Sequence, residues 1–256
     1  MDLSSDIAIV TGASSGLGRR FAEVLAAHGA TVICAARRAD RLSQLVEDIR
    51  RKGGRAEAVS FDAEDPHAPE ALVAAAQKLA GTPTILVNNA GISSAGRAHE
   101  LTLDDFNRTI AVNVRAPWRL SQLCAAPWIM AKKAPAPAGT LRIVNLASIL
   151  ADRVQPGVSI YAMSKAAIAH ITAAHALEWA RYGVRVNALC PGYFRTEIND
   201  AYWDTPAGAA DLARMPRRRL GRPEQLDKAL LFLVDPDNDF TNGEALTVDD
   251  AQRWAM

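Results

Sequence analysis

Cysteine is scarce in this sequence of 256 residues. Only Cys34, Cys124 and Cys190 occur, and no two of them form a CxxC pair. A disulfide framework or a cysteine-rich zinc site needs several cysteines at defined spacings. Neither is therefore expected, and no metal site is predicted.

A large net charge and a long apolar run are also lacking. The 29 Lys and Arg residues nearly balance the 28 Asp and Glu residues, which argues against a dedicated nucleic-acid binder. Apolar residues make up 49% of the chain, too many for a disordered protein. No uninterrupted run of about 18 apolar residues occurs, so no membrane partner is expected. The first six residues, MDLSSD, lack the basic and then apolar pattern of a signal sequence, so we expect a cytoplasmic location.

Short β-branched runs alternate with longer stretches of helical periodicity. Continuous apolar strands separated by helices are typical of a parallel sheet that is covered on both faces. We therefore predict an α/β fold, a single doubly wound Rossmann-type domain over residues 1–256 with a mostly seven-stranded parallel sheet. Residues 131–140 are interpreted as a surface loop. The predicted strands cover residues 7–11, 31–35, about 56–61, 84–88, 141–146, 184–189 and 244–248.

A glycine-rich turn follows the first predicted strand and precedes a helix. Gly12, Gly16 and Gly18 have the spacing Gly-x3-Gly-x-Gly within Thr11–Gly18. Glycines let the backbone turn tightly and approach a pyrophosphate, while the helix N-terminus favours negative charge. A glycine-rich turn is often only a turn, but its place between strand and helix favours dinucleotide binding.

The end of the second predicted strand indicates which dinucleotide is bound. An acid there would hold a ribose 2′-hydroxyl, whereas an arginine would accommodate a 2′-phosphate. The strand ends in Ala35-Ala36-Arg37-Arg38, with no acid at its tip. Because guanidinium pairs bidentately with phosphate, Arg37 favours NADP(H) over NAD(H). The alternative is a solvated basic start of a helix, since Arg41 also lies nearby.

Three side chains could transfer a proton. Tyr161 and Lys165 are four residues apart, on one face of a helix. A neighbouring positive charge lowers the pKa of a phenol, which could then exchange a proton with a carbonyl or alcohol oxygen. Ser148 follows the strand at 141–146, where it could donate a hydrogen bond to the same oxygen. The alternatives are a plain neighbour contact for the pair and a turn cap for the serine.

Taken in order, these blocks resemble the short-chain dehydrogenase/reductase family, in particular its main one-domain subgroup of about 250 residues. The resemblance covers essentially the whole chain, from Ile7 to Asp249. The matching residues are Thr11–Gly18, Asn88-Asn89-Ala90-Gly91, Asn113, Ser148, Tyr161, Lys165, Pro191-Gly192 and Thr196.

The resemblance implies hydride transfer between NADP(H) and a ketone or secondary alcohol. Tyr161 would be the general acid/base and Ser148 would orient the substrate oxygen. Lys165 would hold the ribose and lower the tyrosine pKa, and Asn113 would kink its helix and hold a water that relays protons. Asp62 would bind adenine. The implied cofactor contacts are Gly12, Ser14, Ser15, Gly16, Leu17, Gly18, Arg37, Arg38, Asp62, Asn89, Ala90, Gly91, Tyr161, Lys165, Pro191, Gly192 and Thr196.

The C-terminal part of the chain carries further expectations from the resemblance. Residues 192–222 would form a substrate lid, and the protein would be a homotetramer or homodimer. Where many family members have Asp-Gly-Gly, this chain has Asp249-Asp250-Ala251, which leaves the packing of the tail open.

Other functions are also compatible with the sequence. One is a 3-oxoacyl-thioester reductase of the same family, with an acyl-carrier-protein or CoA substrate. A carrier protein would need a basic patch such as Lys132-Lys133 and Arg181, but Leu177 stands where such reductases commonly have arginine. Less favoured are a non-catalytic dinucleotide sensor, an epimerase or dehydratase of the extended relatives, and nucleic-acid binding through Arg217-Arg218-Arg219.

Overall fold

The computed structural model describes residues 1–130, 140–197 and 199–255. The predicted surface loop at 131–140, except for its last residue, lies outside the described residues. The candidate docking residues Lys132 and Lys133 lie outside them as well.

A parallel sheet forms the centre of the molecule, in the order β3-β2-β1-β4-β5-β6-β7. Every neighbouring pair of strands runs parallel, so the predicted doubly wound α/β sheet of seven strands is confirmed. The predicted strand positions hold to within about two residues at their ends. The strands are β1 (Ile7–Thr11), β2 (Thr31–Ala36), β3 (Arg55–Ser60), β4 (Ile85–Asn88), β5 (Leu141–Leu146), β6 (Val184–Pro191) and β7 (Ala245–Val248).

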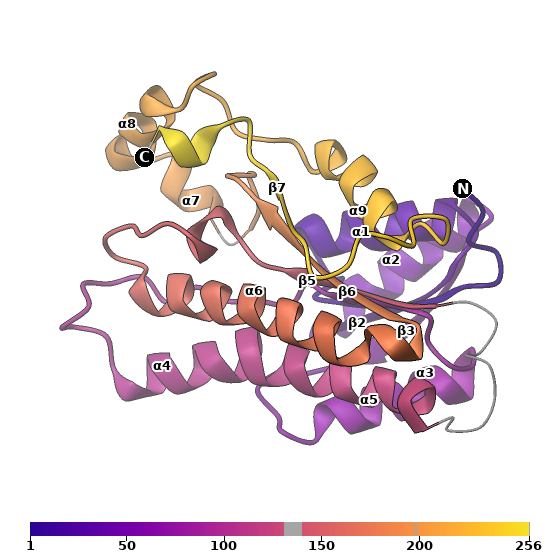
Figure 1. Ribbon diagram of the computed structural model, residues 1–256. Coiled ribbons are helices and arrows are strands. Elements are labelled where there is room, and N and C mark those ends of the chain that lie inside the picture. The colour runs from indigo at the N-terminus through magenta and orange to yellow at the C-terminus, as the bar shows by residue number, and fades with distance from the viewer. Residues whose placement is uncertain (131–139, 198, 256) are drawn as a thin grey trace.

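Helices cover both faces of the sheet (Figure 1). One face carries α1 (Gly16–Ala27), α2 (Ala39–Arg51) and α9 (Asp227–Val234), whose apolar sides share a core with the sheet. The other face carries α3 (Ala68–Leu79), α4 (Leu103–Ile110), α5 (Ala116–Met130) and α6 (Ser159–Trp179). Helical spacing accounts for this packing, since Leu42, Leu45, Val46 and Ile49 are all buried along α2. Among the described residues, no helix has both the length and the hydropathy needed to cross a membrane.

Two short helices lie outside these layers. They are α7 (Asp200–Trp203) and α8 (Pro206–Arg214), both within residues 192–222. Figure 1 shows them at one end of the molecule, with the C-terminus close by. The C-terminal turn is a 3₁₀ helix, η5 (Gln252–Trp254).

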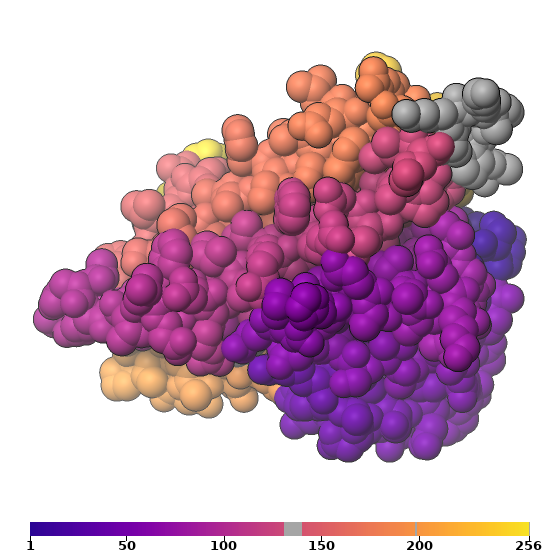
Figure 2. Space-filling model, turned by 90° about the horizontal axis from the view of Figure 1, so that it is seen from below, coloured from indigo at the N-terminus to yellow at the C-terminus, as the bar shows by residue number. Residues whose placement is uncertain are grey.

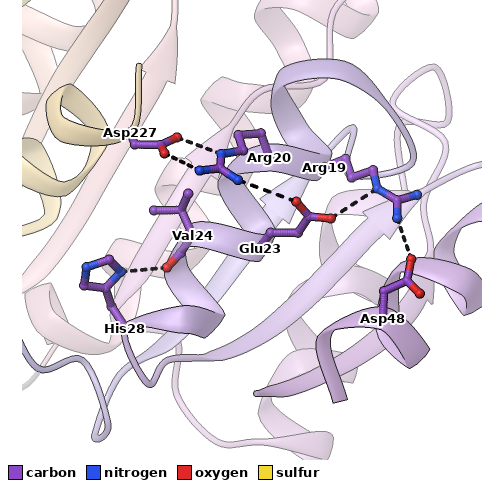
Figure 3. A network of polar contacts seen from close by, with 7 residues as sticks. All are labelled: Arg19, Arg20, Glu23, Val24, His28, Asp48 and Asp227. Atoms are coloured by element: carbon purple, nitrogen blue, oxygen red, sulfur yellow. Dashed lines mark hydrogen bonds and ion pairs between the residues drawn. The ribbon is translucent and has the colours of Figure 1, made fainter. Parts of the chain in front are cut away.

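A network of charged side chains fixes α1 against its neighbours (Figure 3). Arg19 pairs with Asp48 of α2 at 2.6 Å, and Arg20 Nε donates to Asp227 of α9 at 3.0 Å. Glu23 lies between the two arginines and accepts from Arg19. Single exposed ion pairs contribute little to stability, but this network joins three helices. It therefore steadies the helix whose N-terminus follows the glycine-rich turn.

A buried ion pair lies where the strands begin, at the opposite end of β1 from the glycine-rich turn. Arg142 of β5 contacts the carboxylate of Asp6, and their side chains are only 3% and 9% exposed. Thr84 donates to the same carboxylate at 2.7 Å, and Arg142 Nη1 donates to the carbonyl oxygen of Val234 at 3.0 Å. The pair thus joins the starts of β1, β4 and β5 to the end of α9.

Candidate active site

The glycine-rich turn is closed against the end of β4. Gly12 and Gly16 have φ of +68° and +54°, a conformation that side chains with a Cβ rarely adopt. A Cβ at Gly18 would lie 2.3 Å from the carbonyl oxygen of Gly12, so this glycine is needed for the close approach of helix and turn. Asn89 Nδ2 donates to Thr11 O at 2.9 Å and locks the arrangement.

Arg38 lies across the same turn. Its Nη2 donates to Ser15 Oγ at 2.6 Å and to Ser14 Oγ at 3.0 Å, while Nη1 pairs with Glu197 at 2.7 Å. Hydrogen bonding from Arg38 lowers the pKa of Glu197, which also pairs with Arg41. Arg37 is different, because its side chain is 60% exposed and its nearest acid is Glu64 at 3.6 Å. The Arg38 guanidinium therefore already has hydrogen-bond partners within the protein, whereas the Arg37 side chain is largely exposed to solvent.

Asn113 lies in a π-helical turn, η1 (Ala111–Arg115), between α4 and α5. Its Nδ2 donates to Ile92 O and to Ser164 Oγ, both at 2.9 Å, and its Oδ1 accepts from Ile92 N at 2.9 Å. Ser164 Oγ donates in turn to the carbonyl oxygen of Tyr161 at 2.7 Å. Asn113 is 1% exposed, so its amide connects the distorted helix to the backbone of Tyr161 from behind the cleft.

Tyr161, Lys165 and Ser148 meet where β5 ends and α6 begins. Lys165 Nζ lies 5.5 Å from the centre of the Tyr161 ring and donates to Leu146 O at 2.6 Å. Ser148 Oγ accepts from Leu150 N at 3.1 Å, so Ser148 caps the short 3₁₀ helix η2 (Ile149–Ala151). The capping role and the place beside Tyr161 are compatible, because a hydroxyl both accepts and donates.

Burial dominates the protonation of this site. It raises the pKa of Tyr161, and a hydrogen bond from Ser148 offsets only part of that rise. Burial also lowers the pKa of Lys165 to about 8. The expectation that Lys165 lowers the tyrosine pKa stays a prediction: in this structure burial is the largest effect on the pKa of Tyr161, and the Lys165 ammonium donates to Leu146 O. Tyr161 holds its proton at neutral pH.

These residues line one cleft of about 870 Å³. Of the predicted site residues, Gly18 and Asn113 do not line it, because both are buried behind its wall. The predicted residues that line the cleft are Gly12, Ser14, Ser15, Gly16, Leu17, Arg37, Arg38, Asp62, Asn89, Ala90, Gly91, Ser148, Tyr161, Lys165, Pro191, Gly192 and Thr196.

Several lining residues were not foreseen from the sequence. Phe61 and Ala63 follow β3. Because ligands bind at the carboxyl ends of parallel strands, the place of these residues after a strand could have marked them as lining residues. Gln155 and Glu197 carry no local pattern, since only the folded chain brings them to the cleft.

The end of the cleft beyond Tyr161 is closed by aromatic side chains from residues 192–222. Tyr193 packs edge-on against Trp203, with ring centres 5.2 Å apart. Its hydroxyl donates to Gln155 Oε1 at 2.5 Å. Burial raises the pKa of Tyr193 as well, so it is a hydrogen-bond donor and not an ion at neutral pH.

Known proteins of similar sequence and structure fit this geometry. A family model described as "Enoyl-(Acyl carrier protein) reductase" matches residues 12–250. The gluconate 5-dehydrogenase of Gluconobacter oxydans (strain 621H) is 34% identical over 248 residues, covering 96% of this chain and 94% of that protein. A short chain dehydrogenase from Burkholderia cenocepacia J2315, solved in complex with NADP, is 36% identical with a TM-score of 0.89, covering 98% of this chain and 99% of that chain.

A second solved structure from Burkholderia cenocepacia J2315 is similar over its whole length. It is a gluconate 5-dehydrogenase in complex with NADP and tartrate, 30% identical to this chain with a TM-score of 0.91. The match covers 100% of this chain and 98% of that one. The chain therefore belongs to the short-chain dehydrogenase/reductase family, as its motifs predicted, and is an oxidoreductase.

Proposed function

We propose that this protein transfers a hydride between NADP(H) and a ketone or secondary alcohol, with Tyr161 as the general acid/base. One observation carries the proposal. Ser148, Tyr161 and Lys165 line the same cleft as the glycine-rich turn and the two arginines that follow β2. A site that only sensed a dinucleotide would have no use for a partly buried phenol placed beside a serine and a lysine.

The cleft fits a dinucleotide by shape and by charge. At Gly16, a Cβ would come within 3.6 Å of Thr196 on the facing wall and would narrow the opening. The first N–H groups of α1 and the guanidinium groups of Arg37 and Arg38 favour phosphates at this end. We propose that the cleft-lining cofactor residues predicted from the sequence hold NADP(H), with Gly18 and Asn113 supporting them from behind.

The bound cofactor would supply or accept the hydride. In the direction of reduction, Ser148 donates a hydrogen bond to the carbonyl oxygen and Tyr161 delivers the proton to it. Because burial raises the pKa of Tyr161, the phenol is protonated when the ketone arrives. Lys165, with a pKa of about 8, lies beside the ring and stabilises negative charge on Tyr161 after the proton has left. Asn113 holds the start of α6 in place through Ser164.

A panel of carbonyl compounds tests the proposed activity. The purified protein is mixed with NADPH and each ketone, and the loss of NADPH absorbance is followed. The panel includes 5-keto-D-gluconate, because two of the similar proteins are named gluconate 5-dehydrogenases. It also includes 3-oxoacyl-CoA thioesters, the alternative substrate class that the sequence leaves open. Turnover of at least one ketone is expected, and NADPH that neither binds nor reacts at millimolar concentration would contradict the proposal.

The preference for NADP(H) over NAD(H) is part of the proposal, and Arg37→Asp tests it. Aspartate at the end of β2 would repel a 2′-phosphate and accept a hydrogen bond from a 2′-hydroxyl. Loss of one charge-assisted contact predicts that the NADP/NAD ratio of kcat/KM falls by at least about tenfold. Arg50→Asp is the matched control, because Arg50 lies further along the chain in α2, pairs with Glu57 and is not a lining residue of the cleft. An equal effect of both variants would show that only the general charge of the surface matters.

Assembly, location and domain organisation complete the proposal. We propose a single domain with residues 192–222 as a substrate lid, assembled as a homotetramer or homodimer in the cytoplasm. Figure 2 shows the face to which α4 and α5 belong. Phe106, Trp118, Met163 and Leu177 are exposed on α4, α5 and α6, which supports contacts between copies there. Sedimentation equilibrium distinguishes the dimer from the tetramer.

The three cysteines are free thiols, which is compatible with a reducing compartment such as the proposed cytoplasm.

A further inference from the structure

The segment Asp249–Trp254 packs against the proposed lid, at the point where the sequence departs from the family pattern. We propose that this C-terminal segment fixes both ends of the lid and thereby sets the position of Tyr193 over the substrate. Gln252 is its central positioning residue. The inference rests on the proposed function, since it assigns the lid a place in that reaction.

The side-chain amide of Gln252 bridges the two ends of the lid. Its Oε1 accepts from Tyr193 N at 2.6 Å, and its Nε2 donates to Arg219 O at 3.2 Å. Gln252 is only 3% exposed, so both bonds are shielded from water. The two lid ends also bond directly, because Gly221 N donates to Tyr193 O at 2.8 Å.

Gly192 makes room for this amide. A Cβ at Gly192 would lie 2.4 Å from Gln252 Oε1 and 2.8 Å from the Cα of Asp249. The Pro-Gly pair singled out in the sequence as a cofactor contact therefore has a second role. It lets the C-terminal segment approach the start of the lid.

The backbone of the segment is held in an unfavourable conformation. Asp250 and Ala251 have φ of +53° and +64°, the left-handed region that normally favours glycine. Asp249 stabilises the turn by accepting from Ala251 N at 3.1 Å and from Arg253 N at 3.0 Å. Surrounding contacts must support such strain, which commonly occurs at functional sites.

The carboxylate of Asp250 supplies one of those contacts. It pairs with Arg217 at 3.3 Å and with Arg219 at 3.1 Å, both near the far end of the lid. Two of the three consecutive arginines are thereby explained, since they hold the lid to the C-terminal segment. An uncharged glycine at position 250 would keep the turn and lose this attachment.

Tyr193 transmits the constraint to the substrate end of the cleft. Its backbone N–H is fixed by Gln252, while its hydroxyl reaches Gln155 and its ring packs against Trp203. A shift of the Tyr193 backbone therefore moves a wall of the cleft.

Gln252→Leu removes both amide bonds and tests the proposal in the full-length protein. Loss of a buried bridge predicts a roughly tenfold or larger rise in KM for the ketone, with kcat at saturation and the Kd of NADPH changed less than about threefold. Gln252→Glu keeps the acceptor for Tyr193 N but places a second oxygen against Arg219 O, so it is expected to raise KM as well. A role in general stability alone would lower thermal stability in both variants and leave KM unchanged.

Asp250→Asn gives a test that does not disturb the interior. It removes the charge that pairs with Arg217 and Arg219 but suits the left-handed backbone. We expect KM to rise about two- to fivefold, as for the loss of an exposed ion-pair network. Asp204→Asn is the matched control, because Asp204 pairs at 3.1 Å with Arg195 inside the lid. Equal KM values for Asp250→Asn and the control would overturn the role of Asp250.

Amide hydrogen exchange separates this inference from the proposed activity, because it needs no turnover. Peptides from residues 193–197 and 199–221 should exchange faster in Gln252→Leu than in the wild type, while peptides from α6 stay unchanged. Unchanged lid exchange would overturn the inference, whether or not a ketone substrate has been found. Faster lid exchange with an unchanged KM would equally overturn it.

Discussion

Replacing Tyr161 by phenylalanine is expected to lower kcat/KM by roughly 100- to 10,000-fold for any ketone that the wild type reduces. The substitution removes one oxygen, the atom that bonds Ser148 and would deliver the proton. Nothing else in the cleft replaces it directly, because the Lys165 ammonium is committed to Leu146 O at 2.6 Å. Steady-state rates of NADPH oxidation over a range of ketone concentrations measure the effect.

The phenylalanine variant should still fold and bind cofactor. The ring fills the same space, and the proposed phosphate contacts lie on other elements, so the Kd of NADPH from its fluorescence should change little. Tyr182→Phe is the matched control, because Tyr182 bonds Arg181 at 2.7 Å outside the cleft and should retain full activity. Retained activity in Tyr161→Phe would remove Tyr161 as the acid/base and with it the proposed mechanism.

Arg142→Leu is expected to lower the free energy of unfolding by about 3–5 kcal/mol. The substitution leaves the carboxylate of Asp6 buried, with Thr84 as its remaining side-chain donor. It also removes the donor to Val234 O at the end of α9. An unpaired buried charge costs far more than an exposed pair contributes, which makes this the largest stability effect that we expect from one ion pair. Urea denaturation followed by circular dichroism measures it.

Two further variants show whether the charge or the packing is responsible. The double variant Asp6→Leu with Arg142→Met has no buried charge left over and should recover a large part of the loss. Arg50→Leu removes one partner of an exposed pair with Glu57 and should cost no more than about 1 kcal/mol. Equal losses in the free energy of unfolding for Arg142→Leu and Arg50→Leu would mean that burial does not increase the cost of breaking the Asp6 ion pair.

Much of the sheet could be predicted because most of its strands are short, largely apolar runs that end at a glycine or a polar residue. A strand that is covered on both faces does not alternate between apolar and polar residues. Short apolar runs such as Ile7–Thr11 and Leu141–Leu146 can therefore be recognised as buried strands. Their order in the sheet could not be derived from these runs.

Part of the candidate site could likewise be predicted from the sequence, and part could not. Tyr161 and Lys165 are four residues apart on a helix, so sequence spacing alone brings them together. Gln155 and Glu197 reach the cleft from distant loops, and no local pattern marks them. The direction of the Tyr161 pKa was also beyond the sequence, because burial opposes the neighbouring lysine and burial is a property of the folded chain. Asp250 and Ala251 adopt the left-handed conformation, which hydrogen bonds to Asp249 and ion pairs with Arg217 and Arg219 support.

The pairing of Arg38 with Glu197 would link cofactor affinity thermodynamically to the position of the proposed lid. Glu197 belongs to residues 192–222, and its carboxylate uses the Nη1 of the guanidinium that spans Ser14 and Ser15. A 2′-phosphate bound beside Arg38 would compete with this carboxylate for the same cation. The cost of releasing Glu197 then enters the binding free energy of the cofactor. By reciprocity, a substrate that draws residues 192–222 toward the cleft changes cofactor affinity by the same factor.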